Sequence, residues 1–368
     1  MPNIYQRSYS LGITLIVLPA AFLSAENYAG DFLELGVGSR ALGLGGAYVA
    51  VADDITATYW NPAGLVQLAK DGLTNKELRT QIAVQHATRR SGLGHFNYLA
   101  VSRKLKSPVA LAFSWIHAGI DEIPVFPSFD PNITPGDRRY TEKYRPTFTP
   151  AGFISDNQNA YTFTLASSYR IPPEWWDLFG TTSFPPQLLM GLNLKRIAHL
   201  LADDKASGYG LDLGLLVHLP DLNAVIGATG FGGLSLGVYW QSQIAVSWKN
   251  RDIPISSSHQ EVIPHQVRLG LAYLNQVWER QLLLLWTVIQ SASISRNLPS
   301  RYRRQDRLGV EYQLSQRLAL RIGCQNRRRT CGVGLQTTRS DALVLRIDYG
   351  LTSNDIVNTH FVSLIMLF

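Results

Sequence analysis

The sequence predicts an all-β fold, specifically a transmembrane antiparallel β-barrel of about 14 strands with an N-terminal plug that contains short helices. Three observations predict this fold class. Large apolar residues alternate with small or charged ones over most of the chain after about residue 75. Helix signals between these stretches are scarce, so a parallel sheet would lack its crossovers. The chain also ends in an amphipathic stretch that closes on an aromatic residue, Phe368.

Composition excludes several other classes of protein. The chain has 368 residues, of which 46% are hydrophobic and 17% are charged, with 2 cysteines and a net charge of +7. The apolar content is too high for overall disorder, and two cysteines are too few for a disulfide-stapled scaffold. A spanning helix needs about 20 consecutive apolar residues, and no stretch after residue 25 supplies them.

The first 25 residues predict a signal peptide. The run 11–25 is mostly apolar and is preceded by a single charge, Arg7, which suits a signal peptide better than a membrane span. Cleavage after Ala25 would export the chain to the bacterial outer membrane through an oxidising compartment. The alternative is a buried N-terminal strand or helix.

Residues 26–75 are expected to form the plug, because they do not alternate like a strand. Asp53 and Asp54 can cap a following turn, and Asn61-Pro62 favours a turn with Pro62 at the start of a short helix. Gly64 follows in the same motif. These polar residues either gate the lumen or cap a fixed structural plug, and the structural interpretation is favoured.

The stretch Gly36–Leu65 resembles the N-terminal signature of the PorV/PorQ family, within the FadL-type (fatty-acid-transporter-like) outer-membrane barrels. The resemblance rests on Gly38, Arg40-Ala41, Gly43, Gly45-Gly46-Ala47, Ala52-Asp53-Asp54 and Trp60-Asn61-Pro62-Ala63-Gly64. The stretches 264–273 and 346–368 are also similar to later strands of that family. The resemblance implies 14 strands and an N-terminal segment, carrying the Asn-Pro-Ala motif, that folds into the lumen.

Residues 76–368 are expected to form the barrel. Alternation alone does not distinguish a membrane barrel from a soluble sandwich, but strands of about ten residues in an even number favour the barrel. Placing Phe368 at the periplasmic end also puts most long loops outside, including 120–156, and short turns inside; the long segment 172–185 is the exception. The expected strands lie near 77–88, 95–104, 107–119, 157–171, 186–199, 208–218, 234–248, 264–274, 281–293, 306–314, 317–325, 330–338, 342–351 and 358–368.

Charged residues fall on the polar face of these strands and are predicted to face the lumen. They can tune selectivity or hold the plug, or they can pair across neighbouring strands, and pairing is favoured. The lumen-facing charges are Asp212, Arg268, Arg307, Glu311, Arg317, Arg321, Arg346 and Asp348.

Cys324 and Cys331 are predicted to face each other across a hairpin with a loop at 326–329, within disulfide range. The alternative is two independent thiols. No histidine lies near enough to complete a zinc site with them, and no metal or cofactor is expected.

Positive charge is concentrated between residues 296 and 346, which hold 12 arginines and 3 acidic residues. The loop pattern places many of them at the outer rim, where arginine suits phosphate or carboxylate groups. The predicted partner is therefore anionic lipopolysaccharide or the loops of a partner protein, with outer-membrane lipid around the barrel, and no nucleic acid. The predicted basic rim comprises Arg301, Arg303, Arg304, Arg327, Arg328 and Arg329.

No catalytic motif is present, so the chain is not predicted to be an enzyme. The resemblance implies a role in type IX-like protein secretion, with secretion-system components and cargo as partners. The alternatives are a FadL-like channel for the uptake of hydrophobic small molecules and a structural or adhesive barrel. The terminal aromatic Phe368 resembles the signal by which the barrel-assembly machinery recognises its substrates.

Overall fold

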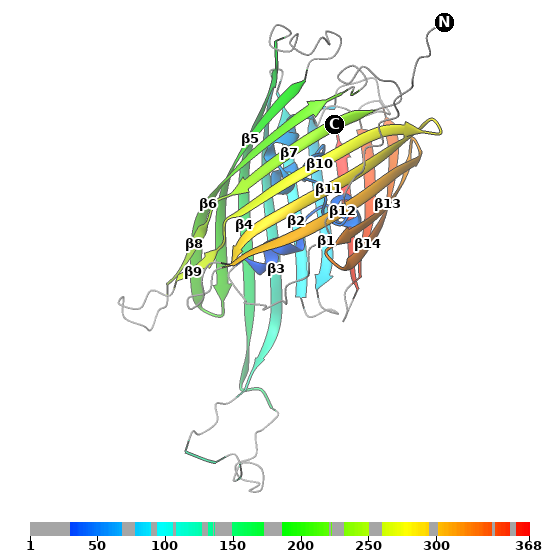
Figure 1. Cartoon of the computed structure of the whole chain (residues 1–368). Coiled ribbons are helices and arrows are strands. Elements are labelled where there is room, and N and C mark those ends of the chain that lie inside the picture. Colours follow the sequence, from blue (N-terminus) through cyan, green and yellow to red (C-terminus); the bar gives the residue numbers. More distant parts are fainter. Residues whose placement is uncertain are drawn as a thin grey trace, which may run out of the picture.

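The computed structural model describes most of the chain. The described residues are 30–67, 78–89, 94–105, 108–126, 132–134, 136, 149–172, 186–220, 222, 232–249, 260–293, 301–340, 343–353 and 358–368. The predicted signal peptide, the Trp175-Trp176 segment and most of the loop between 127 and 148 lie outside these ranges. The described chain has two parts, a short helical segment and a large sheet (Figure 1).

Four short helices make up the segment 30–67. Glycines with positive φ at 30, 36, 38, 45 and 46 interrupt it, so no helix extends beyond six residues. Within the described ranges, none of the helices is long and apolar enough to cross a membrane. The helices are η1 (Asp31–Leu35), α1 (Ser39–Gly43), α2 (Ala57–Trp60) and η2 (Pro62–Gln67).

Antiparallel strands form the rest of the structure. Their bounds agree with the 14 stretches of alternation to within a few residues, except where β3 and β4 extend the hairpin around the long loop (Figure 1). The strands are β1 (Thr80–Arg89), β2 (Gly94–Lys104), β3 (Val109–Val125), β4 (Gly152–Arg170), β5 (Gln187–Leu201), β6 (Asp204–Leu219), β7 (Gly233–Gln241), β8 (Ile244–Lys249), β9 (Gln260–Ile263), β10 (Gln266–Val277), β11 (Arg280–Ser293), β12 (Arg301–Ser315), β13 (Leu318–Gln325), β14 (Arg328–Ser340), β15 (Leu343–Thr352) and β16 (Thr359–Leu367).

The sheet closes into a barrel of 14 wall strands, which confirms the predicted fold class. β1 pairs with both β2 and β16, and every neighbouring pair is antiparallel. The 16 segments make 14 wall strands. β7 and β8 both pair with β6 and together form one wall strand. β9 and β10 together form the next wall strand, because β9 pairs with β8 in the same register in which β10 pairs with β7. The two ends of the barrel are called here the C-terminal end, which holds Phe368, and the loop end, which holds the β3–β4 hairpin.

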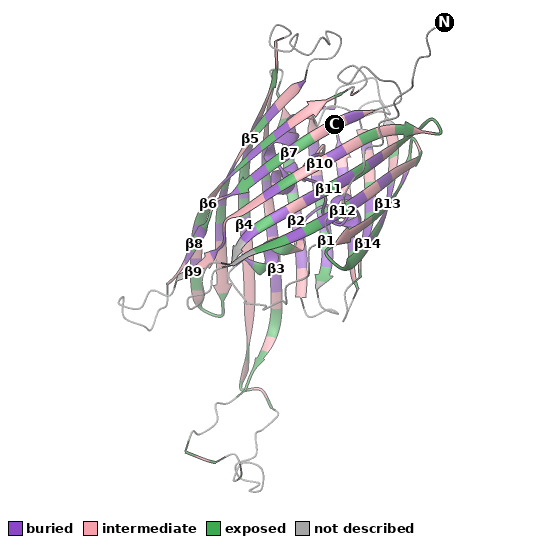
Figure 2. Cartoon of the chain, viewed as in Figure 1, coloured by how far each residue is buried: buried purple, intermediate pink, exposed green. Residues whose placement is uncertain are grey.

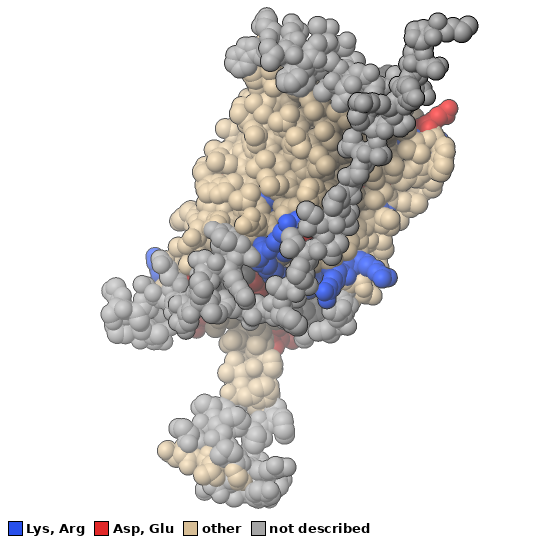
Figure 3. All heavy atoms as spheres, viewed as in Figure 1, with Lys and Arg blue, Asp and Glu red and all other residues tan. Residues whose placement is uncertain are grey.

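The two faces of the wall differ in side-chain character. Large apolar side chains such as Phe113, Leu269 and Ile322 are exposed on the outer face, at 46%, 51% and 63%. Small or polar side chains are buried on the inner face, and the alternation runs along the strands in Figure 2. Figure 3 shows a broad outer belt without charged residues, with Lys and Arg gathered toward the loop end. This distribution is typical of a barrel whose outside faces lipid.

The segment 30–67 lies inside the barrel and is called the plug. Its backbone approaches the wall where the inner face carries glycine. A Cβ atom at Gly309 would lie 2.6 Å from the Leu44 carbonyl oxygen, and one at Gly350 would lie 2.8 Å from that of Ser39. Both approaches are closer than real Cβ atoms tolerate. Glycine is therefore required at these wall positions for the plug to fit.

The predicted disulfide between Cys324 and Cys331 is wrong, because both cysteines are free. The β13–β14 hairpin has a tighter turn than expected, at Asn326 and Arg327, with Asn326 at φ 56°. Cys324 is therefore opposite Arg329, and Cys331 is opposite Ile322. A two-residue shift in register is enough to separate the two thiols.

Candidate functional site

A chain of alternating charges joins the plug to the wall at Arg40. The Arg40 guanidinium donates to both carboxylate oxygens of Glu311 on β12, at 2.9 and 2.8 Å. It also donates to Asp53 of the plug at 2.6 Å. Arg40 and Glu311 are both buried, each with 10% of its side chain exposed. Two hydrogen bonds from one guanidinium to one carboxylate fix the relative orientation of the two groups and also strengthen the contact.

The chain of charges continues along the wall. Arg321 on β13 donates to Glu311 and to Asp348 on β15, both at 2.6 Å. β14 lies between β13 and β15, and its residue at this level is Gly334. A Cβ atom there would lie 2.6 Å from the Asp348 carboxylate. The absence of a side chain at Gly334 lets Arg321 reach across the intervening strand.

Within the plug, Tyr48 and Asp53 complete this network. The Tyr48 hydroxyl lies 2.7 Å from Asp53 and 2.9 Å from Asp54. Burial opposes ionisation of Asp53, but the Arg40 guanidinium and the Tyr48 hydroxyl outweigh it and hold the pKa of Asp53 below its ordinary value. Burial also opposes the charge on Arg40, yet Asp53 and Glu311 raise the pKa of Arg40 above its usual range. Arg40 and Asp53 are therefore both charged at neutral pH.

The Asn61-Pro62 turn contacts a different part of the wall. Asn61 is fully buried, and its amide donates to the Val49 carbonyl at 2.9 Å and to that of Leu215 on β6 at 3.2 Å. Its side-chain oxygen accepts from the Ala63 N–H at 3.2 Å. Gly64 packs against the Ala52 carbonyl, where a Cβ atom would clash. These contacts tie the predicted plug motif to the rest of the plug and to β6.

A second buried ion pair lies beside this turn. The Lys195 ammonium is 2.9 Å from Asp212, and Asn193 donates to Asp212 at 3.1 Å and to the Thr58 carbonyl at 2.9 Å. Thr164 donates to Asn193 at 2.7 Å. The lumen charge Asp212 is thus paired on the wall and linked through Asn193 to plug helix α2.

Arg268 and Arg307 differ from these paired charges. They are 5% and 7% exposed, yet in the described part of the chain neither has a carboxylate within the 4.0 Å that defines an ion pair. Their described side-chain hydrogen bonds go to neutral amides, from Arg268 to Gln266 at 2.6 Å and from Arg307 to Gln305 at 3.3 Å. Arg268 Nη1 and Arg307 Nε have no partner among the described residues.

Aromatic rings of the plug and wall surround the two guanidinium groups. Arg268 lies 5.0 Å from the Tyr59 ring centroid and 4.7 Å from that of Tyr239. The Trp60 ring centroid is 5.7 Å from Arg268 and 5.8 Å from Arg307. Cation–π contacts at such distances offset part of the cost of burying a charge, but they do not neutralise it.

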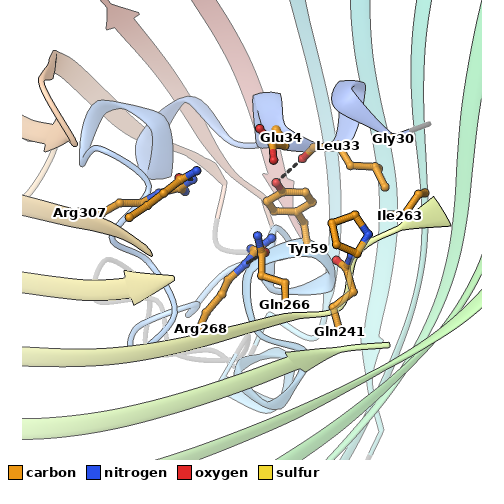
Figure 4. Close-up of a pocket in the computed structure, with 11 residues that line it drawn as sticks. Gly30, Leu33, Glu34, Tyr59, Gln241, Ile263, Gln266, Arg268 and Arg307 are labelled. Atoms are coloured by element: carbon orange, nitrogen blue, oxygen red, sulfur yellow. Dashed lines mark hydrogen bonds between the residues drawn. The ribbon is translucent and has the colours of Figure 1, made fainter. Parts of the chain in front are cut away.

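These arginines line a pocket at the loop end of the lumen, called the loop-end pocket. Figure 4 shows both guanidinium groups directed from the wall toward Tyr59, whose hydroxyl donates to the Leu33 carbonyl. The pocket has about 430 Å³ of space outside atoms, counting the part open to solvent. Its lining is Gly30, Leu33, Glu34, Tyr59, Gln241, Ile263, Pro264, Gln266, Arg268, Gln305 and Arg307.

A second pocket, called the C-terminal pocket, lies on the other side of the plug. It has about 630 Å³ of space on the same measure, and Arg40, Asp53 and Glu311 line it together with His218 and Gln281. The plug separates the two pockets near Ala50, which packs against Gly270 of β10. The charged residues Arg40, Asp53 and Glu311 of the C-terminal pocket form ion pairs with one another. Arg268 and Arg307 of the loop-end pocket have no described carboxylate partner.

The remaining predicted charges lie elsewhere. Arg346 is partly buried, with its guanidinium 3.9 Å from the Asp54 carboxylate. Arg317 is exposed in the turn between β12 and β13 at the C-terminal end, so its assignment to the lumen is wrong. The strand β13 begins at Leu318, one residue later than the alternation suggests. Among the described side chains of the predicted basic rim, all are exposed near the loop end, namely Arg303, Arg304, Arg327, Arg328 and Arg329. The side chain of Arg301 lies outside the described set.

Several residues of these sites were not singled out from the sequence. Arg40 is the only charged residue between Leu35 and Ala52, which is a signal that could have identified it. Lys195 lies on the polar face of β5 and could have been included with the other lumen charges. Tyr59 gave no signal, because nothing in the alternation of the wall predicts which aromatic residues of the plug meet Arg268.

No protein-family model and no curated protein sequence matches the chain. Solved structures do resemble it. The Pseudomonas putida toluene transporter TodX is 12% identical with a TM-score of 0.52, and the CymD monoaromatic hydrocarbon channel is 11% identical with a TM-score of 0.51. Each match covers 90% of this chain and 97% of the other. At this identity the likeness concerns the fold alone.

Proposed function

We propose that the protein is a plugged outer-membrane channel for the uptake of small hydrophobic molecules. One observation carries this proposal: two pockets lie along the lumen on opposite sides of the plug, where Ala50 meets Gly270. A solute that enters one pocket needs a shift of the plug to reach the other. The fold shared with a toluene transporter and a monoaromatic hydrocarbon channel supports the same function.

The outer surface supports a location in the outer membrane. Its apolar belt suits lipid (Figure 3). The alternating last strand ends at Phe368, whose backbone is hydrogen-bonded to Thr80 in both directions. With the C-terminal end facing the periplasm, the exposed arginines of the loop end face outward. There they would meet anionic lipopolysaccharide.

The paired charges fix the resting position of the plug in this proposal. Arg40 holds the plug to Glu311, and Asn61 holds it to β6. Movement of the plug requires at least one of these buried contacts to break, which keeps the lumen closed to polar solutes at rest.

A role in type IX-like secretion is the second candidate function. The observation that favours it is the glycine-rich stretch Gly36–Leu65, which resembles the PorV/PorQ signature. Such a barrel would receive or present exported cargo. Deletion of the gene distinguishes the two roles, since loss of secreted proteins with unchanged hydrocarbon uptake supports secretion.

A reversible lock on the plug tests the channel. The Ser39 N–H donates to the Ser363 hydroxyl on β16 at 3.2 Å, so the plug and the wall are in contact at these two positions, which are chosen for an engineered disulfide. The substitutions Ser39→Cys and Ser363→Cys are made in a chain whose native cysteines are replaced by serine. Uptake of radiolabelled toluene is then measured in cells that carry this barrel, before and after reduction.

Uptake that is low in the oxidised cells and recovers on reduction supports a channel with a moving plug. The reduced protein is the matched control for the oxidised one. Toluene uptake equal to that of cells without the barrel, in the reduced state, contradicts the proposal.

A further inference from the structure

We infer that His95 and His117 form a binding site for a divalent transition-metal ion of the Cu²⁺ type. The two residues lie on neighbouring strands, β2 and β3, on the outside of the barrel wall. The inference goes beyond the proposed function, because the site lies outside the lumen. It rests on the geometry of the two imidazole rings and on the residues that hold them in place.

The alternation of the wall places both histidines on its outer face. His95 is four residues before Leu99, and His117 is four residues after Phe113. Leu99 and Phe113 are outward-facing, at 45% and 46% exposed, and residues an even number apart on a strand share a face. Both histidines lie near the loop end, where β2 begins at Gly94 and where β3 continues into the hairpin with β4 (Figure 1). The His95 side chain is 32% exposed, so an ion in water can reach it.

The distance between the two rings suits a shared ion. Nε2 of His95 lies 2.9 Å from Nε2 of His117. Bonds from a metal to imidazole nitrogen are about 2.0–2.1 Å long, so two such nitrogens at right angles on one ion are about 2.9 Å apart. Ligands at right angles are typical of square-planar or tetragonal Cu²⁺ and Ni²⁺. An ion can therefore replace the hydrogen bond between the rings after a small rotation of each ring, with both strands in place.

The neighbours of His117 direct a lone pair toward this ion. Trp115 Nε1 donates to the side-chain oxygen of Asn159 at 3.0 Å, and His117 Nδ1 lies 3.1 Å from the same oxygen. Because the amide oxygen only accepts, Nδ1 of His117 carries its proton, and the neutral ring has its lone pair on Nε2. The Trp115 and His117 rings also stack, with centroids 5.5 Å apart and planes at 22°. A partner that fixes the second ring nitrogen is a common feature of metal-binding histidines.

The His95 ring has room beside β3 because of Gly119. A Cβ atom at Gly119 would lie 2.6 Å from His95 Nε2 and 3.1 Å from the side-chain oxygen of Asn157, so the glycine leaves an open place between these two groups. Nδ1 of His95 is 4.0 Å from the Asp121 carboxylate, which favours a proton on Nδ1 when Nε2 binds an ion. The described residues hold no metal-sized group of three or more His, Cys, Asp or Glu side chains. Water therefore completes the coordination of an ion held by the two rings.

Titration of the purified full-length barrel with Cu²⁺, without a polyhistidine tag, tests the inference. We expect one saturable site whose dissociation constant rises about tenfold or more in His95→Gln and in His117→Gln, because a single imidazole cannot chelate the ion. The electron paramagnetic resonance spectrum of the bound Cu²⁺ should show two ring nitrogens in wild type and one in each variant.

His86→Gln is the matched control. His86 lies on β1, two residues after the outward-facing Val84, and its ring is hydrogen-bonded to Asn97 at 2.8 Å. Its loss should leave the Cu²⁺ affinity at the wild-type level. Gly119→Ala keeps both histidines but places a Cβ atom 2.6 Å from the His95 ring, and it should weaken Cu²⁺ binding as well. Heat-modifiable migration on a gel checks that each variant is folded.

Equal Cu²⁺ affinity in wild type, His95→Gln and His117→Gln overturns the inference, as does the absence of a saturable site in the wild-type protein. A loss of affinity in His86→Gln as large as in the two ligand variants also overturns it, because the binding would then not be specific to the pair. Toluene uptake through the unlocked plug is a separate measurement. Failure of the metal site therefore leaves the proposed channel intact, and failure of the channel leaves the metal site intact.

Discussion

The two ends of the lumen treat buried arginine in opposite ways. Toward the C-terminal pocket, Arg40 and Arg321 join Glu311, Asp53 and Asp348 in one chain of ion pairs. Toward the loop end, Arg268 and Arg307 stack on aromatic rings and have no described carboxylate partner. Buried arginine therefore attaches the plug to the wall in one place and lies beside aromatic rings in the other.

The largest expected effect is at Glu311, because both Arg40 and Arg321 depend on it. Replacing Glu311 by Gln leaves two buried guanidinium groups short of an anion, and we expect the free energy of unfolding to fall by about 3–5 kcal/mol. Denaturant unfolding in detergent micelles measures it.

Asp306→Asn on the same strand is the matched control for Glu311→Gln. Asp306 is 49% exposed in its side chain and pairs with an exposed arginine, so its loss should cost about 0.2–1 kcal/mol. Equal effects of the two substitutions would mean that the buried network does not hold the plug.

An intermediate effect is expected at the boundary between the two pockets. In Gly270→Ala the new Cβ would lie 2.9 Å from the Ala50 nitrogen, so the plug must move, at a cost of about 1–3 kcal/mol in the free energy of unfolding. Protease cleavage within residues 39–60 should also become faster. Gly152→Ala is the control, since nothing lies within 4 Å of its added Cβ; cleavage at the wild-type rate in Gly270→Ala would show that the contact does not position the plug.

A small effect is expected at Arg307. Arg307→Met removes a buried charge that has no described carboxylate partner, which is favourable, together with a cation–π contact to Trp60 worth about 0.5–1 kcal/mol. The two changes oppose each other, so the free energy of unfolding should change by no more than about 1 kcal/mol. A fall in the free energy of unfolding as large as that of Glu311→Gln would show that the arginines at the two ends of the lumen contribute equally to stability, and would contradict the comparison.

The smallest effect is the pH dependence of Asp53, whose side chain is 38% exposed. Its pKa in the folded protein is lowered from 3.8, so the unfolded state binds a proton first as the pH falls. The stability contributed by the ionised group is complete above the unfolded value and is lost as the pH falls through the folded value. The protection factors of the plug amides against hydrogen exchange should therefore be constant from pH 8 to about 5, and the protection that wild type has over Asp53→Asn should be lost only below about pH 4. A loss that begins near pH 6 would assign it to another group.

Local chemistry predicted the wall of this protein closely. Leu318–Ile322 and Leu343–Tyr349 alternate so clearly that their strands and faces follow from period two, and the lumen position of Arg321 and Asp348 follows from the same count. Prediction was wrong at Arg317, where the turn delays the start of β13 by one residue, and at the cysteine pair, where the hairpin is tighter than expected. Turn geometry decides those positions, and alternation does not report it.

The sequence by itself determined the closed antiparallel wall, its two faces and the separate character of residues 30–67, because these depend on side chains that are near neighbours in the chain. Only the tertiary structure decided which charges are partners. Arg40 meets Glu311 across 271 residues, whereas Arg268 and Arg307 meet aromatic rings and a pocket. Glu311, Arg268 and Arg307 all follow the same alternation of the wall. What distinguishes their partners is the position at which the folded plug crosses the lumen.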